Sequence, residues 1–209
     1  MGRARALLPS VLAAACVSAA GARAAEQGYT VVAEQSAVRI HVGKSGLFGF
    51  AGHSHDIVAP VAQGTVVADP ADLARSSVTL SFDAAALKVT AEGEPAGDAP
   101  KVQEKMAGPE VLDVARFPSI TFRSTSVAGK EVRAGVYDLQ VTGDLALHGA
   151  TRRTVLPLRV EVAAETLTAS GKTVLRQTDF GMKPVSVGGV VNVKNELGVD
   201  FRIVARAGR

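Results

Sequence analysis

Alternation of apolar and polar residues recurs along most of this chain and constrains the fold more than any other feature. In the segment SSVTLSF, residues 76–82, a valine, a leucine and a phenylalanine alternate with serines and a threonine. Successive side chains of a strand point to opposite faces, so such a segment has one apolar and one polar face. Antiparallel sheets with one face on the core and one in water have this pattern. The pattern occurs in residues 37–42, 76–82, 135–147, 155–162 and 198–206.

Turn-forming residues separate these segments, for example at 128–130 and 148–153. We count about eight strands, with no helical segments between them that could serve as parallel crossovers. The prediction is an all-β, antiparallel domain, and periodicity alone leaves open whether it is a two-sheet sandwich or a closed barrel. Pro157 interrupts one strand pattern and predicts a sheet edge or a bulge there.

One stretch departs from the alternation. The residues KVQEKMAGPEVLDVARFP, 101–118, have apolar residues four positions apart, as on one face of a helix. Gly108 and Pro109 lie near the middle of this stretch and favour a break. We therefore predict one or two short helices within 101–118.

Residues 1–24 have the composition of a secretory signal peptide. Two arginines precede an apolar run, and a small-x-small cleavage motif ends at Ala24. The run is short and contains Pro9, which argues against a membrane span. We therefore expect cleavage between Ala24 and Ala25, a periplasmic location and a single domain over residues 25–209.

Removing this segment changes the charge balance. It holds three arginines and no acidic residue, so the counts fall from 23 basic and 20 acidic residues to 20 and 20. A balanced chain without a basic run gives no indication of nucleic-acid binding. Cys16 is the only cysteine and lies in the signal, so the mature chain is expected to have no disulfide. Lipid anchoring through Cys16 is the alternative.

The segment GHSHD, residues 52–56, is the main candidate for a metal site. His53 and His55 would share a face of a strand, which suits two ligands of one ion. Zinc needs a third protein ligand and usually a fourth. The other histidines do not supply them, because we expect His41 on the outer face of a strand and His148 at a turn. We therefore favour a turn at a strand entry and keep a metal site at His53 and His55 as the alternative.

The same segment contains the three residue types of a hydrolase triad. Ser54, His55 and Asp56 are consecutive, however, and neighbours in sequence do not adopt the geometry of a triad. The chain also has no G-x-S-x-G nucleophile motif. We therefore predict no catalytic residues.

Four stretches, taken in order, carry a resemblance to a known family: YTVVAEQSAVRIHVGKSGLFGFAGHSH, KMAGPEVLDVARFPSITFRST, VTGDLALHGATRRTVLPL and LRQTDFGMKP. Together they resemble the YceI-like family of polyisoprenoid-binding proteins, and the GHSH sequence resembles one subgroup of it. The similarity covers about residues 29–206, nearly the whole of the expected mature chain.

The resemblance implies an extended, lipocalin-like antiparallel β-barrel that acts as a binding protein and not as an enzyme. Its ligand would be a long apolar lipid, isoprenoid or quinone-type, held without a cofactor. Without the resemblance, a filled core would be the favoured interpretation of the apolar stripes, because most inward stripes are core. Monomer and homodimer both remain open. The residues expected to line the lumen are Val38, Ile40, Val78, Leu80, Phe82, Phe122, Leu139, Val141 and Phe201.

Overall fold

The computed structural model describes residues 26–45, 54–92, 97–187 and 191–208. Within them the chain forms twelve strands, one α-helix and four short 3-10 helices. The strands are β1 (Gln27–Val31), β2 (Ala37–Ser45), β3 (His55–Val58), β4 (Gln63–Ala68), β5 (Ser77–Asp83), β6 (Lys88–Val89), β7 (Ser119–Arg133), β8 (Val136–Leu147), β9 (Ala150–Ala163), β10 (Thr166–Arg176), β11 (Ser186–Val187) and β12 (Val191–Ala207). The helices are α1 (Asp98–Ala107), η1 (Ala33–Gln35), η3 (Leu73–Arg75), η4 (Ala84–Ala86) and η5 (Gln177–Phe180).

Eight of the strands close into an antiparallel barrel in the order β1-β4-β5-β7-β8-β9-β10-β12. The ring is completed by pairing between the first and last strands, where Tyr29 lies opposite Ala207. The predicted all-β antiparallel fold is confirmed. Because the first and last strands pair, the fold is a closed barrel and not a two-sheet sandwich. A closed sheet hides its apolar face inside and leaves no free edge where the ring is complete.

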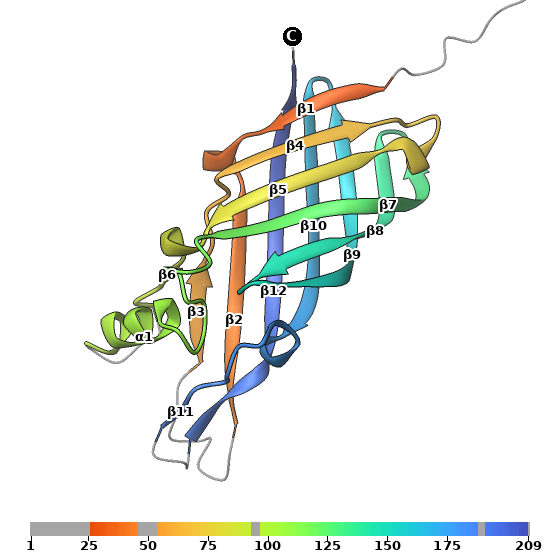
Figure 1. The fold of residues 1–209 in the computed structure, drawn as a ribbon. Coiled ribbons are helices and arrows are strands. Elements are labelled where there is room, and N and C mark those ends of the chain that lie inside the picture. The colour runs from red at the N-terminus through yellow and green to blue at the C-terminus, as the bar shows by residue number, and fades with distance from the viewer. Residues whose placement is uncertain (1–25, 46–53, 93–96, 188–190, 209) are drawn as a thin grey trace, which may run out of the picture.

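The remaining strands extend the wall beyond the ring. β2 pairs with β12 from Asn192 to Arg202, β3 pairs with β2, and β6 pairs with β3. This extension runs down to the end of the molecule that carries α1 and β11 (Figure 1). Helix α1 lies against β6, where the Gln103 side chain accepts from Val89 N at 2.8 Å and donates to Leu87 O at 2.9 Å.

The helical prediction was correct only in part. One helix forms, it starts at Asp98, before the predicted stretch, and it ends at Ala107. Residues after Gly108 form a series of turns in place of a second helix. Asp113 has a left-handed φ of 46°, which a continuous right-handed helix cannot include, and Pro109 comes directly after the C-cap residue Gly108.

Buried apolar side chains form three groups: one is made by Phe122, Val127 and Val141, and the other two lie toward the ends of the barrel. One lies toward the β1 end and includes Tyr29, Leu167 and Ala205. The other lies toward the α1 end and includes Phe180 and Met182. The barrel interior between them is where the apolar faces of the strands meet.

Candidate ligand-binding cavity

An interior cavity of about 280 Å³ lies inside the barrel. That volume is close to the lower bound of about 300 Å³ for small-molecule sites. All nine residues predicted to line the lumen lie on its wall: Val38, Ile40, Val78, Leu80, Phe82, Phe122, Leu139, Val141 and Phe201. Their contact with a ligand stays a prediction.

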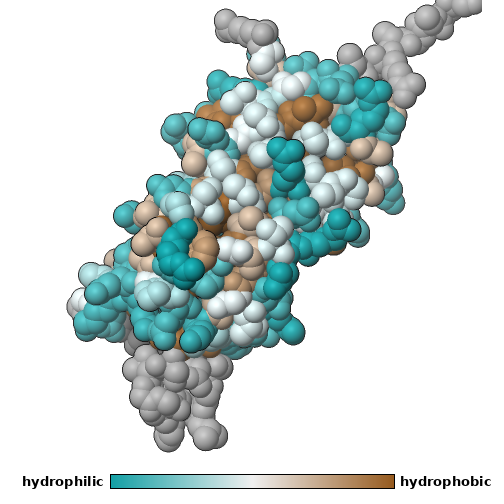
Figure 2. Space-filling view, in the orientation of Figure 1, coloured by the Kyte–Doolittle hydropathy of each residue, from teal (hydrophilic) through white to brown (hydrophobic). Residues whose placement is uncertain are grey.

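The wall is built from the inward positions of the strands, as alternation predicts. β5 contributes Val78, Leu80 and Phe82, and the neighbouring strands contribute the residues directly opposite. Leu80, for example, pairs with Phe122 of β7. The Phe122 ring lies against Gly143 of β8, where any side chain would collide with it. On the face shown in Figure 2, hydrophilic residues dominate the outer surface and hydrophobic residues appear in its recesses.

The sequence prediction missed much of the wall. Leu145, Leu156 and Leu158 also lie on the apolar phase of their strands, so alternation was sufficient to find them. Met106 of α1 and Leu112 of the following turns line the cavity as well, with exposures of 7% and 6%. No strand periodicity marks these two, because they reach the cavity from a helix and a loop.

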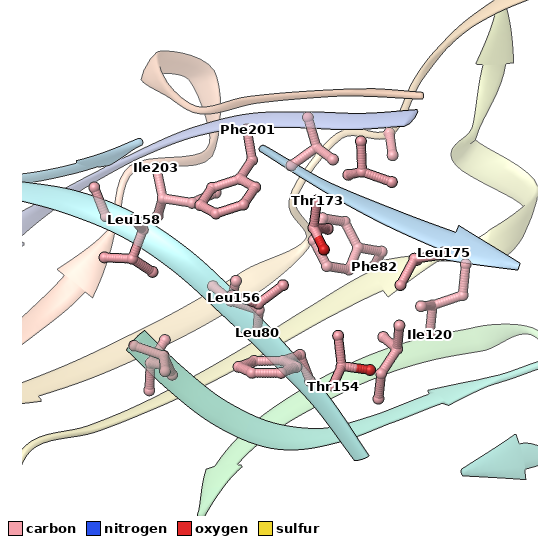
Figure 3. A pocket seen from close by; sticks show the side chains of 18 of the residues that line it. Leu80, Phe82, Ile120, Thr154, Leu156, Leu158, Thr173, Leu175, Phe201 and Ile203 are labelled. Carbon is pink, nitrogen blue, oxygen red and sulfur yellow. The ribbon is translucent and has the colours of Figure 1, made fainter. Parts of the chain in front are cut away.

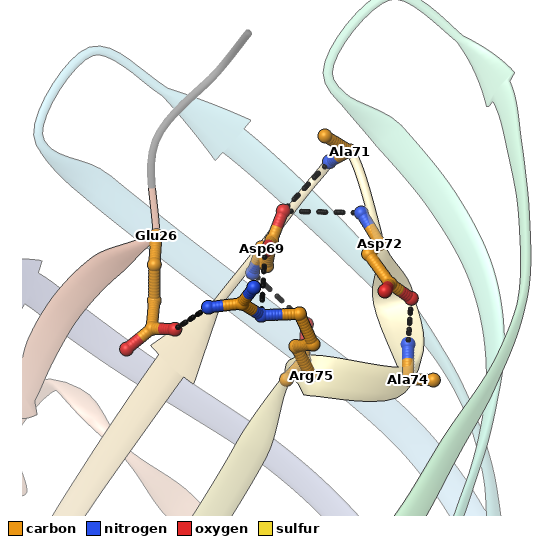
Figure 4. Close-up of polar contacts among 7 residues, drawn as sticks. Glu26, Asp69, Ala71, Asp72, Ala74 and Arg75 are labelled. Carbon is orange, nitrogen blue, oxygen red and sulfur yellow. Dashed lines mark hydrogen bonds and ion pairs between the residues drawn. The ribbon is translucent and has the colours of Figure 1, made fainter.

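The end of the barrel at the β4–β5 connection is covered by η3 and its capping residues. Asp69 borders the cavity and is 6% exposed. Its carboxylate accepts hydrogen bonds from the backbone N–H groups of Ala71 and Asp72, both at 3.0 Å, and lies 3.3 Å from Arg75 Nε (Figure 4). Arg75 in turn pairs with Glu26 at 3.2 Å. This carboxylate therefore stabilises the connection and has its hydrogen-bonding capacity taken up locally.

At the opposite end the cavity is bounded by Met106, Met182 and Gln177. Gln177 is 4% exposed and donates from Nε2 to Lys194 O at 2.8 Å. Its amide nitrogen is therefore satisfied within the protein, as buried polar groups usually are. The Asp69 carboxylate at one end and the Gln177 amide nitrogen at the other are thus both engaged within the protein.

The side wall is open between β9 and β10. Their ladder runs from the turn at Ala163 and Thr166 down to the pair of Leu158 with Gly171 and ends there. Below that pair, β9 continues beside β8 alone and β10 beside β12 alone. The predicted sheet edge at Pro157 is confirmed. This proline is the first residue of β9, past the ladder, that has no partner in β10, and on its other side it stays paired with Gln140 of β8.

Two polar side chains lie on the edges of this opening, one on each strand. Thr154 of β9 and Thr173 of β10 both line the cavity and are half-buried (Figure 3). The Thr154 hydroxyl donates to Arg152 O at 3.4 Å, which is a long hydrogen bond. The rest of this region of the wall is apolar, with Leu156 and Leu175 beside the two threonines.

The histidines do not assemble into a metal site in the part of the chain that the structure describes. No group of three or more histidine, cysteine, aspartate or glutamate side chains lies close enough there to hold an ion. His53 falls outside the described residues, and His55 lies on β3 opposite Val42. His41 is exposed, as predicted, and its Nδ1 lies 2.8 Å from an oxygen of Asp56.

The same contact separates the residues of the supposed triad. Asp56 is directed toward His41 on the neighbouring strand, while His55 occupies the alternate face of β3. Consecutive strand residues point in opposite directions, so Asp56 cannot orient the His55 ring. His148, also as predicted, lies at a turn with φ of 50° and contacts Phe180 O through Nδ1 at 3.0 Å.

Charge on the barrel is concentrated on the outer face. Arg159 donates to Asp138 from Nε at 2.8 Å and from Nη2 at 3.1 Å, and this lowers the pKa of the Asp138 carboxyl. Tyr137 lines the cavity, and burial, followed by the charge and hydrogen bond of Glu131, raises the pKa of its hydroxyl. A neutral phenol suits an apolar wall. Among the described helices, none is long and apolar enough to span a membrane.

An antiparallel barrel with an apolar lumen and one α-helix defines the class of protein. The model of the YceI-like domain matches residues 29–205, so the chain belongs to the YceI-like family. UPF0312 proteins of Vibrio cholerae are 26% identical to it over 132 residues, which is 60% of this chain. The matched region spans 64% of the length of these curated relatives.

Solved structures show the same fold at low sequence identity. BcnA of Burkholderia cenocepacia superimposes with a TM-score of 0.57 at 22% identity, covering 83% of this chain and 98% of BcnA. A polyisoprenoid-binding domain from Saccharophagus degradans gives 0.57 at 13%, covering 87% and 99%. The YceI protein of Campylobacter jejuni gives 0.50 at 12%, covering 79% and 84%.

Proposed function

We propose that this protein is an exported carrier that holds a long apolar lipid, isoprenoid or quinone-type, in its barrel. The observation that carries this proposal is the cavity itself, which is lined almost entirely by aliphatic and aromatic side chains contributed by most of the barrel strands. A chain of CH₂ and CH₃ groups matches such a wall, because each CH₂ group removed from water contributes about 0.8 kcal/mol. The structural similarity to a polyisoprenoid-binding domain supports the same ligand class.

Binding without catalysis fits the groups around the cavity. Catalysis needs titratable or nucleophilic groups directed at a reacting atom. Asp69 is held by its own loop. Tyr137 is protonated at neutral pH, as an ordinary phenol is, and burial raises the pKa of its hydroxyl further. The proposed activity is therefore transport or storage, with the lipid unchanged.

The proposed location is the periplasm, on the basis of the signal-like sequence at residues 1–24. Intact-mass measurement of the protein from its native host tests this. The mature form is expected to begin at or near Ala25 with no lipid on Cys16. A diacylated N-terminus at Cys16 would replace the soluble carrier with a membrane-anchored one.

The binding proposal is tested with two adjacent substitutions on β9. Leu156 lines the cavity, whereas Val155 points outward and is 48% exposed. Leu156→Lys places an ammonium group at the wall of the lumen, where desolvation of a charge is costly. Val155→Lys adds the same charge to the outside. Both positions lie on the part of β9 that has only one neighbour, so both variants are expected to fold.

The measurement is native mass spectrometry and lipid extraction after expression in the original host. Wild type and Val155→Lys are expected to carry a long-chain lipid, and Leu156→Lys to carry much less. Wild type without lipid, and without affinity for added isoprenoid alcohols or quinones, would refute the proposal.

A further inference from the structure

The opening between β9 and β10 is a bounded window in the barrel wall. Its upper limit is the last ladder pair, Leu158 with Gly171. Its lower limit is the contact between His148 at the β8–β9 turn and Phe180 of η5, at 3.0 Å. Between these limits each strand has a neighbour on one side only, so backbone N–H and C=O groups along both edges are left unpaired with each other.

We propose that the ligand enters and leaves the cavity sideways through this window and that its polar head group lies there, between Thr154 and Thr173. The inference rests on the proposed function and adds the route and the head-group site. The ligand class it defines is a long apolar chain that ends in a small oxygen-containing group, a hydroxyl or a carbonyl.

The sequence of β9 and β10 accounts for the window. If the ladder continued in register past Leu158 and Gly171, Pro157 would lie opposite Lys172. The two-residue turn is closed by a hydrogen-bonded pair, and such pairs alternate along an antiparallel ladder. Counted from Ala163 and Thr166, Pro157 falls in a hydrogen-bonded position and has no N–H to donate. The ladder ends at the residue that cannot continue it.

Like charges also disfavour pairing of β9 with β10 further along the two strands. In the continued register Arg153 would lie directly opposite Arg176, and like charges in such a pair are destabilising. Each arginine already has an acidic residue across its paired side, Asp144 for Arg153 and Glu196 for Arg176. The charge of these two arginines therefore disfavours joining the two edges at this position.

Polar side chains are few on the cavity wall, and two of them lie at this window. Thr154 and Thr173 line the lumen from the two edges, among mostly apolar neighbours (Figure 3). Together with the unpaired backbone groups, their hydroxyls offer hydrogen bonds to a head group while the chain occupies the lumen. At the two ends of the cavity, the Asp69 carboxylate and the Gln177 amide nitrogen are engaged within the protein.

Closing the window with a covalent bridge tests the route. Val155 and Val174 would be partners in the continued ladder and both point outward, with exposures of 48% and 64%. The variant Val155→Cys/Val174→Cys, in a chain with Cys16→Ser, is joined as a disulfide or, if the strands stay too far apart, by a short bis-maleimide. The control Lys172→Cys/Asp200→Cys bridges β10 to β12, which are already paired.

The probe is all-trans-retinol, a fluorescent isoprenoid alcohol, with uptake and release followed by stopped-flow fluorescence. Bridging the window is expected to slow uptake and release together by about tenfold or more while Kd stays within about threefold, because a blocked route changes rates and leaves the two end states alone. The control bridge is expected to change neither. Equal rates before and after bridging, or equal slowing by the control bridge, would overturn the sideways route.

The head-group site has its own test. In Thr154→Val/Thr173→Val both hydroxyls are replaced by methyl groups of the same shape. Retinol is expected to bind more weakly to this variant, and the corresponding polyene without the hydroxyl is expected to bind as it does to wild type. Equal losses for both probes would place the head group elsewhere. A wild-type protein that binds neither probe nor native lipid would refute the proposed function, and the window inference would fall with it.

Discussion

Two phenylalanines of this protein allow an empty lumen to be distinguished from a packed core. Phe180 is 2% exposed and does not border the cavity, so Phe180→Ala is expected to cost about 3–5 kcal/mol, as for other buried phenylalanines. Phe82 is half-buried and has the cavity on one side. Part of its surface borders the cavity in place of packed neighbours, so Phe82→Ala in the ligand-free protein is expected to cost less, about 1.5–2.5 kcal/mol.

The assay is urea unfolding of delipidated protein. The slope of the free energy of unfolding against urea concentration should be the same in both variants, which shows that they expose the same surface on unfolding. The two variants are expected to differ in the opposite sense in the lipid they retain. Phe82→Ala should reduce the bound lipid, whereas Phe180→Ala should leave the lipid per folded molecule largely unchanged. Equal losses of stability in the two variants would mean that Phe82 is packed on all sides. The lumen would then be filled in solution, and the reasoning from the cavity would be wrong.

Three other perturbations have defined outcomes. Gly149→Ala should destabilise the protein by more than about 1 kcal/mol in urea melts, because φ is +73° there and a Cβ would collide with the Phe117 ring; an unchanged midpoint would contradict this. Burial raises the pKa of the Tyr137 hydroxyl above its usual 10.0. The contribution of this group to the free energy of unfolding is therefore fully present at neutral pH and is lost as the pH rises through the folded-state pKa. Tyr137→Phe should reduce this loss of stability in melts above pH 10. His53→Gln/His55→Gln should keep its fold and lipid content, and stoichiometric zinc in the wild type that this variant loses would restore the metal alternative.

Most of the barrel could be predicted because its strands bury one face only. Residues such as Leu80 and Leu139 alternate with polar neighbours, and that pattern fixes both the element and the side that faces inward. The nine predicted lining residues lie on the cavity wall for this reason. The alternation could not predict that the sheet closes, because strands have the same period in a sandwich and in a barrel. The prediction of a barrel came from the family resemblance.

Other parts were not predictable from local patterns. The residues after Gly108 have helical spacing, yet Asp113 adopts a left-handed φ and the chain turns, so that Leu112 packs onto the cavity. Helical spacing does not reveal such a break. Pro157 did predict a sheet edge, but only the register of β9 with β10 shows that the edge is a window into the lumen. Whether a sheet edge opens into the lumen depends on residues of both β9 and β10, which the pattern of one strand does not include.

The pairing of β1 with β12 has a consequence for how the protein reaches its native state. The barrel ring is completed by residues near 29 and 207, from opposite ends of the chain. Contacts of such high sequence separation carry a large loop-closure entropy, which makes them slow to form. The ring therefore closes only once residues 205–207 are available to pair with β1, and until then the edge of β1 that faces β12 is open to pairing with other chains. Folding yield should depend on protein concentration, and a holdase chaperone in the compartment where the chain folds would raise it.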